Sequence, residues 1–368
     1  MKSKHISILL PNLGGGGAER AYLELAYEFA KKNYHVEFVV MRLNGELLTE
    51  AKETFSIVDL QCSRLRNLPI ALIRYFRKSQ PKFMITAMWP LTVIAPFSKF
   101  FSNHSCKIII CEQNNLSHQY QKFGFIKKIA MRISMSLGYR LAYARVGVSK
   151  GVVDIISNLS GLQLKKFEVI NNPVSQCKEA SSSSIIEVEK RWSCPPGTRV
   201  ISVGSFKSQK NHQLLFKAIA NIKNPNIRLM LVGDGEDREK LKNLAKKLKI
   251  ETNIIFVGFQ IDLSPFYKTS DLFVLSSDYE GFGNVIVEAL SYGIPVVSTD
   301  CPYGPSEILD NGRFGTLVPV GDIDALAIAI KEKLNSLQKN NYNLMKRASE
   351  FFPEILASKY LRLLNEID

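Results

Sequence analysis

Short apolar runs alternate with amphipathic segments along most of the chain. A continuous apolar run bounded by turn residues is typical of a strand that is buried on both faces. In the first half such runs cover residues 5–11, 35–41, 56–60, 83–88, 107–113, 144–149 and 166–174. In the second half they cover residues 199–206, 227–235, 253–259, 271–277, 295–300 and 315–320. Because helical segments separate the runs, the pattern predicts an α/β protein with parallel sheets covered by helices on both faces.

A break in this rhythm divides the chain. Residues 175–198 hold a serine run and a Pro-Pro-Gly sequence, which are typical of a linker. We therefore predict two Rossmann-like, doubly wound domains facing a cleft, at residues 1–180 and 181–350. Residues 351–368 are expected to form a terminal helix that packs back toward the first domain. Ligands of such sheets bind beyond the carboxyl ends of the strands, so the loops there are the candidates for chemistry.

Neither a membrane span nor a disulfide framework is expected. The longest apolar stretch, at residues 83–98, contains two prolines and is shorter than the roughly 20 residues that cross a bilayer. The amino terminus lacks the apolar segment and cleavage site of a signal peptide. The six cysteines include no Cys-x-x-Cys pair and are expected to be reduced thiols. These features predict a cytoplasmic protein.

Positive charge is concentrated in one region. The net charge is +14, and residues 51–150 alone hold 16 basic and 3 acidic residues. Within them, residues 64–78 and 122–145 combine regularly spaced apolar residues with lysine and arginine. Basic amphipathic helices are typical of surfaces that bind anionic membranes, although helices packed on a core with solvated charges have the same pattern. We expect peripheral association with the inner face of the cell membrane.

The strongest candidate for a ligand site follows the fourth predicted strand of the second half. There Glu280 is followed by Gly281 and Gly283, and a helix is expected to start near Asn284. Glycines let the backbone approach a ligand closely, and a helix start offers N–H groups and a positive dipole end to an anion such as a diphosphate. Glu288 lies about one turn inside this helix, where a carboxylate can accept both hydroxyls of a ribose.

Glu280 and Glu288, with seven residues between them, resemble the E-x7-E signature of family 4 glycosyltransferases of the group 1 type. Further matching segments are VGVSKGV (146–152), VINNPV (169–174), LVGDGEDREKL (231–241), VGF (257–259), GIPVVSTD (293–300), GPSEIL (304–309) and GTLVPVGD (315–322). The resemblance implies a retaining, metal-independent enzyme of the GT-B fold that acts in bacterial surface-polysaccharide assembly. It assigns Glu280 to the donor sugar as a catalytic residue and Glu288 to the nucleotide ribose. The other implied donor contacts of this segment are Gly281, Phe282, Gly283, Asn284 and Val285.

A second donor contact is predicted in GSFKSQKNH, residues 204–212. Members of the family usually have an arginine and a lysine here that hold the donor diphosphate. Lys210 keeps the lysine position and is assigned a catalytic role, but Ser205 stands where the arginine would be. Lys207 is a candidate to supply the missing charge. A lysine is a point charge and not a planar fork, so it constrains the diphosphate less.

The glycine-rich segment GGGGAER, residues 14–20, lies between the first predicted strand and helix. Glycines ahead of a helix start suit a phosphate or a sugar, but no Gly-Lys-Ser/Thr follows, so the segment is not a Walker loop. The resemblance places Gly15 and Gly16 across the cleft from the donor. Glu19 and Arg20 are equally consistent with ordinary helix-start residues.

Acceptor contacts are expected in the loop after the strand at residues 107–113. Related enzymes often have a histidine in this loop. Here Gln113 stands near that place, Asn114 follows it, and His118 lies five residues further on. These three residues are the predicted acceptor side.

A metal site is not expected. Asp322 and Asp324 spell Asp-x-Asp, which is a metal motif in other glycosyltransferases. They stand at the start of a predicted helix, however, where aspartates are good caps. We therefore interpret them as capping residues and expect neither a metal nor another cofactor.

The favoured function is transfer of a hexose or N-acetylhexosamine from a nucleotide sugar to a lipid-linked saccharide. The family's habits favour a UDP-sugar as donor and a saccharide on a polyprenyl diphosphate as acceptor, as in O-antigen or capsule synthesis. A GT-B sugar-nucleotide epimerase is the alternative, although its soluble substrate would need no membrane-facing basic region. A nucleic-acid partner is not expected, because no zinc finger, helix-turn-helix or RNP motif is present.

Overall fold

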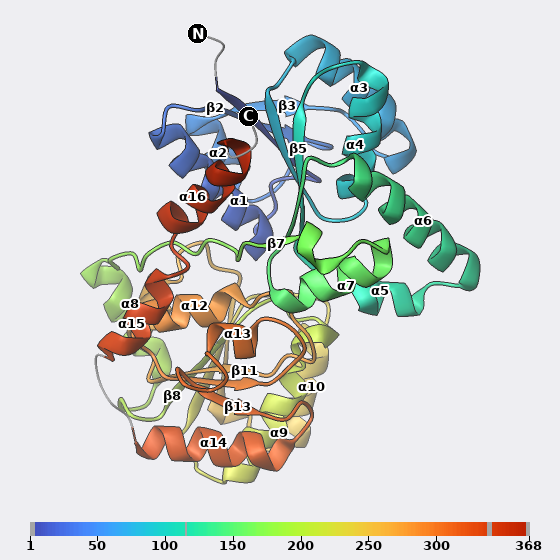
Figure 1. The fold of residues 1–368 in the computed structure, drawn as a ribbon. Coiled ribbons are helices and arrows are strands. Elements are labelled where there is room, and N and C mark those ends of the chain that lie inside the picture. The colour runs from blue at the N-terminus through green and yellow to red at the C-terminus, as the bar shows by residue number, and fades with distance from the viewer. Residues whose placement is uncertain (1–3, 115, 337–340, 366–368) are drawn as a thin grey trace. The chain divides into compact units, whose positions relative to one another are not determined.

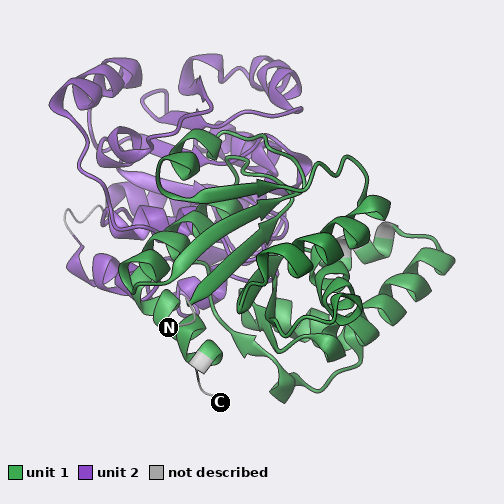
Figure 2. Ribbon diagram, turned by 90° about the horizontal axis from the view of Figure 1, so that it is seen from above, with its two compact units in different colours: residues 1–174, 353–368 green, residues 175–352 purple. Residues whose placement is uncertain are grey.

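The chain folds into two compact units. The computed structural model describes residues 4–114, 116–336 and 341–365. Unit 1 comprises residues 1–174 together with residues 353–368, and unit 2 comprises residues 175–352 (Figure 2). The chain thus enters unit 2 after Val174, six residues before the boundary placed from the sequence, and returns to unit 1 at Pro353.

The described part of unit 1 contains a seven-stranded parallel sheet in the order β3-β2-β1-β4-β5-β6-β7 (Figure 1). Its strands are β1 (His5–Leu10), β2 (His35–Val40), β3 (Ser56–Asp59), β4 (Phe83–Ala87), β5 (Lys107–Glu112), β6 (Ala144–Gly147) and β7 (Glu168–Val169). β1, β4 and β5 are buried along almost their whole length, as expected of central parallel strands covered on both faces.

The last helix of unit 1 comes from the end of the chain. The helices of this unit are α1 (Gly17–Lys31), α2 (Leu48–Thr54), α3 (Leu68–Ser79), α4 (Leu91–Ser102), α5 (Leu116–Lys122), α6 (Phe125–Leu141), α7 (Lys150–Ser160) and α16 (Pro353–Asn365). α16 packs against α1. Its Tyr360 is buried edge-on against Phe29, with 6.5 Å between ring centroids, and donates a hydrogen bond to Sγ of Cys111 at 3.3 Å. The carboxyl-terminal helix is therefore part of the core of unit 1.

The long apolar stretch at residues 83–98 becomes β4 and the first part of α4. Pro96 lies inside α4, where a proline removes one backbone hydrogen bond. The helix packs against α3 and α6, and Pro96 itself is buried. No helix among residues 4–114, 116–336 and 341–365 is long and apolar enough to cross a membrane.

The described part of unit 2 contains a six-stranded parallel sheet in the order β10-β9-β8-β11-β12-β13. Its strands are β8 (Arg199–Val203), β9 (Arg228–Val232), β10 (Ile254–Gly258), β11 (Leu272–Leu275), β12 (Val296–Thr299) and β13 (Thr316–Val318). Its helices are α8 (Ser182–Trp192), α9 (His212–Ile222), α10 (Arg238–Lys247), α11 (Ser264–Lys268), α12 (Asn284–Ser291), α13 (Pro305–Ile308), α14 (Ile323–Asn335) and α15 (Tyr342–Ser349). The predicted α/β class with two parallel, doubly wound sheets is confirmed.

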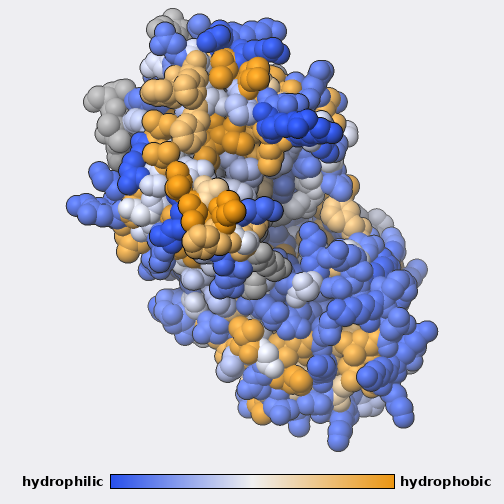
Figure 3. Space-filling model, turned by 90° about the vertical axis from the view of Figure 1, so that its right-hand side faces the viewer, coloured by the Kyte–Doolittle hydropathy of each residue, from blue (hydrophilic) through white to orange (hydrophobic). Residues whose placement is uncertain are grey.

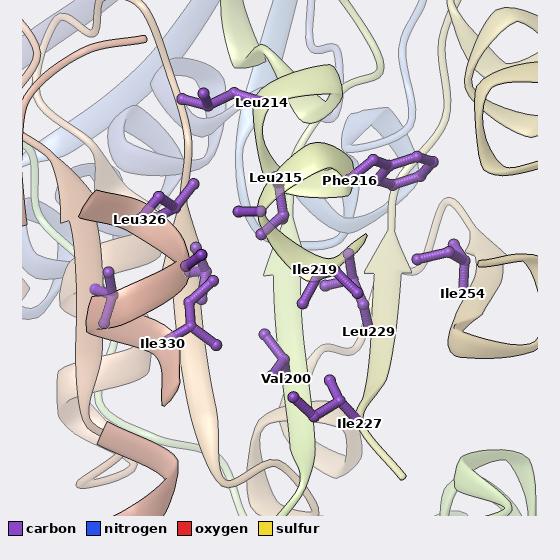
Figure 4. Packing of buried hydrophobic residues seen from close by; sticks show 14 of the residues in the cluster. Val200, Leu214, Leu215, Phe216, Ile219, Ile227, Leu229, Ile254, Leu326 and Ile330 are labelled. Carbon is purple, nitrogen blue, oxygen red and sulfur yellow. The ribbon is translucent and has the colours of Figure 1, made fainter. Parts of the chain in front are cut away.

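One hydrophobic layer of unit 2 lies between its sheet and helices α9 and α14. Leu215 and Ile219 from α9 meet Leu326 and Ile330 from α14 above Val200 of β8 (Figure 4). All five side chains are buried. Full burial of one such side chain is worth about 1.5–3 kcal/mol, so this layer is a main source of the stability of unit 2.

The predicted linker at residues 175–198 is wrong over much of its length, because it contains α8. The serine run starts this helix: Ser181 caps it by accepting a hydrogen bond from the backbone N–H of Ser184 at 3.2 Å. At the other end, Trp192 is fully buried and donates from Nε1 to Oγ1 of Thr269 at 2.9 Å. The serines that suggested a flexible segment act as a helix start.

Candidate active site

The strand order of unit 2 reverses between β8 and β11. In a doubly wound sheet, ligands bind beyond the carboxyl ends of the strands at such a reversal. The loops that follow these two strands are tied together. The N–H of Asp278 donates to the carbonyl of Gln209 at 2.9 Å, and Nε2 of Gln209 donates to the carbonyl of Tyr279 at 2.8 Å. The loops thereby bring Lys210 beside Glu280.

Lys210 and Glu280 form an ion pair with 2.7 Å between Nζ and Oε1. Their side chains are only 18% and 7% exposed. Ser277, which is fully buried, donates to the same carboxylate oxygen at 2.6 Å, and Oγ1 of Thr299 donates to the carbonyl of Ser277 at 2.6 Å. A charge pair with so little water is tolerated only when further hydrogen bonds support it. The Glu280 carboxylate is therefore held in one orientation by two donors.

The segment that leads into α12 is closely packed. Gly283 is the N-cap of α12 with φ of 104°, a conformation that favours glycine. A Cβ at Gly304 would lie 1.8 Å from the carbonyl oxygen of Phe282, so only glycine fits there. Phe282 is buried, with its ring 5.5 Å from that of Phe351. The other predicted donor residues of this segment are half-buried: Gly281, Asn284 and Val285. The start of α12, with its positive dipole end, is thus fixed close to the ion pair.

Glu288 lies on α12, eight residues after Glu280 in the chain, and is half-buried. Its Oε2 accepts a hydrogen bond from the hydroxyl of Tyr267 at 2.8 Å. Both carboxylates of the motif are thus oriented by a hydroxyl group, Glu280 by Ser277 and Glu288 by Tyr267.

Lys207 lines a neighbouring cavity. Its side chain is exposed, whereas Ser205 is half-buried in the same loop. The cavity has a volume of about 220 Å³ and is lined by Lys207, Ser208, Asn211, His212, Gln213, Asp237, Leu241 and Asp278. The structure thus brings Lys210 to Glu280, while the compensating charge expected from Lys207 stays a prediction.

The segment that holds this site matches a known family. The family described as glycosyl transferases group 1 matches residues 195–350, which include the ion pair, the α12 segment and Glu288. The chain is a glycosyltransferase, and its residues 195–350 match group 1.

Relatives of this glycosyltransferase extend over its whole length. The N-acetylgalactosamine-N,N'-diacetylbacillosaminyl-diphospho-undecaprenol 4-alpha-N-acetylgalactosaminyltransferase of Campylobacter jejuni is 27% identical over 97% of this chain and 99% of its own. The amylovoran biosynthesis glycosyltransferase AmsD of Erwinia amylovora is 26% identical over 95% and 96%, respectively. Among solved structures, Anabaena HepE in complex with UDP-glucose has a TM-score of 0.83 with 19% identity, covering 99% of this chain and 100% of HepE. The predicted GT-B fold is confirmed.

In unit 1 of this glycosyltransferase, the glycine-rich segment leads from β1 into α1. The N–H of Gly15 donates to Oε2 of Glu46 at 2.8 Å, and Gly16 is the N-cap of α1. Arg20 donates to both carboxylate oxygens of Glu50 on α2, at 2.8 and 2.7 Å. Arg20 therefore connects two helices, while ligand contacts at Gly15 and Gly16 stay a prediction.

The predicted acceptor residues differ in their surroundings. Gln113 is buried: its Nε2 donates to the hydroxyl of Tyr22 at 3.1 Å, and its Oε1 has no partner among the described residues. Asn114 is exposed, and the side chain of His118 lies outside the described residues. Gln113 therefore packs within unit 1, and Asn114 is the better candidate for contact with an acceptor.

The capping interpretation of the Asp-x-Asp motif is confirmed for its first residue. Oδ1 of Asp322 accepts a hydrogen bond from the N–H of Ala325 at 2.9 Å at the start of α14. Oδ1 of Asp324 accepts one from Nδ2 of Asn221 at 2.9 Å. Both carboxylates thus have structural partners within unit 2.

Sequence reasoning missed His212, the first residue of α9. It is buried, and its ring lies edge-on to Phe206 with 5.3 Å between centroids. Burial lowers the pKa of His212 to about 4, and the positive charge of Lys210 adds to this effect. The sequence does not show whether the ring of a histidine at a helix start is buried.

We expect unit 2 to lose stability as the pH falls from 6.5 to 4, because the unfolded chain protonates His212 near pH 6.5 and the folded chain only near pH 4. The loss attributable to this group is up to about 3 kcal/mol. His212→Phe keeps an aromatic ring and removes the titration. Urea unfolding at several pH values, followed by Trp192 fluorescence in a Trp89→Phe background, measures the free energy of unfolding of both proteins. If the difference between their free energies of unfolding does not change with pH, His212 is not the group responsible.

Proposed function

We propose that this glycosyltransferase moves a hexose or N-acetylhexosamine from a UDP-sugar to a lipid-linked saccharide, with retention of configuration at the anomeric carbon. The product would belong to a surface polysaccharide of the O-antigen or capsule type. The observation that carries the proposal is the grouping of Lys210, Glu280 and the start of α12 at the reversal of strand order in unit 2. A cation, a carboxylate and a positive helix end together suit a sugar diphosphate.

The related proteins support this choice of substrates. The Campylobacter jejuni relative is named for an acceptor on undecaprenyl diphosphate and for an alpha linkage. HepE was crystallised in complex with UDP-glucose. Because the common UDP-hexoses carry their sugar in alpha linkage, an alpha product corresponds to retention.

In the proposed reaction, the bond between the anomeric carbon and the diphosphate oxygen breaks, and its electron pair leaves with the diphosphate. The acceptor hydroxyl oxygen bonds to the same face of the anomeric carbon, and its proton passes to the departing diphosphate. Lys210 and the start of α12 stabilise the negative charge that builds on this leaving group. Glu280 orients the sugar through its hydroxyls, and Glu288 holds the ribose. Because Lys210 supplies the cation, the reaction needs no metal ion.

A lipid-linked acceptor lies at the bilayer surface, so the proposed enzyme docks there. The two basic helices differ in what they can offer. On α3, Leu68, Leu72, Tyr75 and Phe76 are buried in unit 1. Most of the apolar side of α3 is thus already used by the core, and its charges are ordinary solvated ones.

The basic helix α6 has apolar residues on its outer face. Its inner face is formed by Met131, Met135, Gly138 and Tyr139. Its exposed apolar residues are Phe125, Ile126, Ile129, Ile133, Leu137 and Leu141. Figure 3 looks onto this side of unit 1, where apolar side chains gather beside hydrophilic ones. Lys127 and Arg132 are exposed on the same helix, so α6 combines the apolar and basic groups that an anionic membrane attracts.

Replacing Glu288 with Gln should weaken UDP binding, since it keeps the side chain's size and removes its charge. Hydrogen bonds to charged groups are worth about 1.5–3 kcal/mol, so the affinity should fall about tenfold or more. Isothermal titration calorimetry with UDP measures the change, with Glu332→Gln on the exposed side of α14 as control. Unchanged UDP binding by Glu288→Gln would overturn the ribose assignment.

Lys210→Ala should lose about 100-fold or more in turnover of the UDP-sugar, because the leaving diphosphate loses its preorganised cation. Lys217→Ala, an exposed lysine of α9, is the matched control and should keep full turnover. The wild-type protein should stay active in EDTA. Activity that EDTA abolishes and manganese restores would contradict the metal-free mechanism, and turnover without any acceptor would favour the epimerase.

The wild-type protein should sediment with anionic phosphatidylglycerol vesicles, bind neutral phosphatidylcholine vesicles poorly, and be released in part by high salt. Each basic residue near such a surface is worth about 1 kcal/mol, so Lys127→Glu with Arg132→Glu on α6 should weaken sedimentation strongly. Arg74→Glu with Arg77→Glu on α3 is the matched control. The amount of this variant that sediments should be closer to that of wild type than the amount of the α6 variant is. Wild-type protein that stays in the supernatant at low salt would argue for a soluble acceptor.

A further inference from the structure

Tyr267 lies along the face of α12 that carries Glu288. Glu288 and Tyr292 are four residues apart, so both project from the same side of this helix. The hydroxyl of Tyr267 donates to Oε2 of Glu288 at 2.8 Å. Its ring stacks on that of Tyr292, with 5.4 Å between centroids and 17° between planes. One aromatic side chain from α11 thus spans from the carboxylate to the end of α12.

The position of Tyr267 is fixed from several sides. It is buried, and its ring also packs against that of Phe273 on β11, with 6.3 Å between ring centroids. The stacked partner Tyr292 is itself held, because its hydroxyl accepts from the N–H of Lys178 at 3.1 Å and lies 3.2 Å from the same residue's carbonyl. Burial, together with the negative charge of Glu288, raises the pKa of Tyr267 well above its ordinary value. The hydroxyl therefore keeps its proton, and can donate a hydrogen bond, at neutral and moderately alkaline pH.

A glutamate on a helix surface has several rotamers, and ordering its side chain costs conformational entropy. A rigid donor that holds one carboxylate oxygen removes much of this freedom before a ligand arrives. A tyrosine hydroxyl does so without a positive charge that would compete with the ligand for the carboxylate. Preorganisation of this kind raises affinity by reducing the cost of ordering on binding.

We propose that Tyr267 is a positioning residue that holds Glu288 in the orientation that accepts ribose hydroxyls, and thereby sets the preference for ribonucleotides over 2′-deoxyribonucleotides. The inference rests on the proposed function, because it takes Glu288 as the ribose contact. Tyr267 does not touch the reacting atoms, so its effect falls on nucleotide binding and the donor KM, and kcat at saturating donor stays near that of wild type.

The test is calorimetric binding of UDP and of 2′-deoxy-UDP to the whole protein and its variants. Tyr267→Phe keeps the stacked ring and removes the bond to Glu288. It should lose about fivefold or more in UDP affinity, as expected for a hydrogen bond to a charged group, and most of the preference for UDP over 2′-deoxy-UDP. Tyr292→Phe is the matched control: it removes the other hydroxyl of the stacked pair and should keep the preference.

A double variant separates positioning from folding. Tyr267→Phe combined with Glu288→Gln should bind UDP no more weakly than Glu288→Gln alone, since the two groups act as one unit.

The outcomes are distinct. A wild-type protein that prefers UDP to 2′-deoxy-UDP, with an equal preference in Tyr267→Phe, would overturn the positioning role and leave the proposed function intact. A wild-type protein that binds neither uridine nucleotide would overturn the proposed donor, and the inference with it. A fall in melting temperature of Tyr267→Phe with unchanged nucleotide affinities would mean that the hydroxyl serves only the fold.

Discussion

All strands of a parallel sheet end at the same edge, and in unit 2 the strand order reverses at that edge between β8 and β11. At such a reversal, the helices that follow the two neighbouring strands lie on opposite faces of the sheet, which leaves room for a ligand between the loops. One loop carries Lys210 and the other carries Glu280, and a backbone and a side-chain hydrogen bond of Gln209 join the two loops. The candidate site therefore depends first on this topology, which brings the two loops together, and only then on individual side chains.

Within that frame, the two glutamates are prepared differently. Glu280 is nearly buried and is compensated by the ammonium of Lys210, with Ser277 as a second donor. Glu288 is half-buried and has the neutral hydroxyl of Tyr267 as a donor. A diphosphate would compete with Glu280 for Lys210, whereas a ribose would add hydrogen bonds to a Glu288 that is already oriented. This difference suits Glu280 for the sugar end of a donor and Glu288 for its nucleotide end.

The parallel sheets could be predicted from the sequence because strands buried on both faces leave continuous apolar runs, as in β9 and β12. The helix α8 could not, since its serine cap and the following Pro-Pro-Gly are also typical of a linker. The spacing of Glu280 and Glu288 indicated the candidate site. Ser277 and Tyr267 were missed, because a hydroxyl residue acquires its role only through a partner that tertiary packing brings within reach.

Charge alone also failed to distinguish α3 from α6, because both helices are basic and amphipathic in sequence. The distinction lies in which apolar residues the core of unit 1 already covers, and that is a property of packing. Each surface cation of α6 is screened by water and salt and contributes little by itself. Such cations attract an anionic surface only when several act together. Lys210 is one cation, but it is mostly shielded from water and fixed by its partners, so its field at a bound anion is far less screened. In the proposed function, basic residues would thus attract a membrane surface in unit 1 and stabilise a leaving group in unit 2.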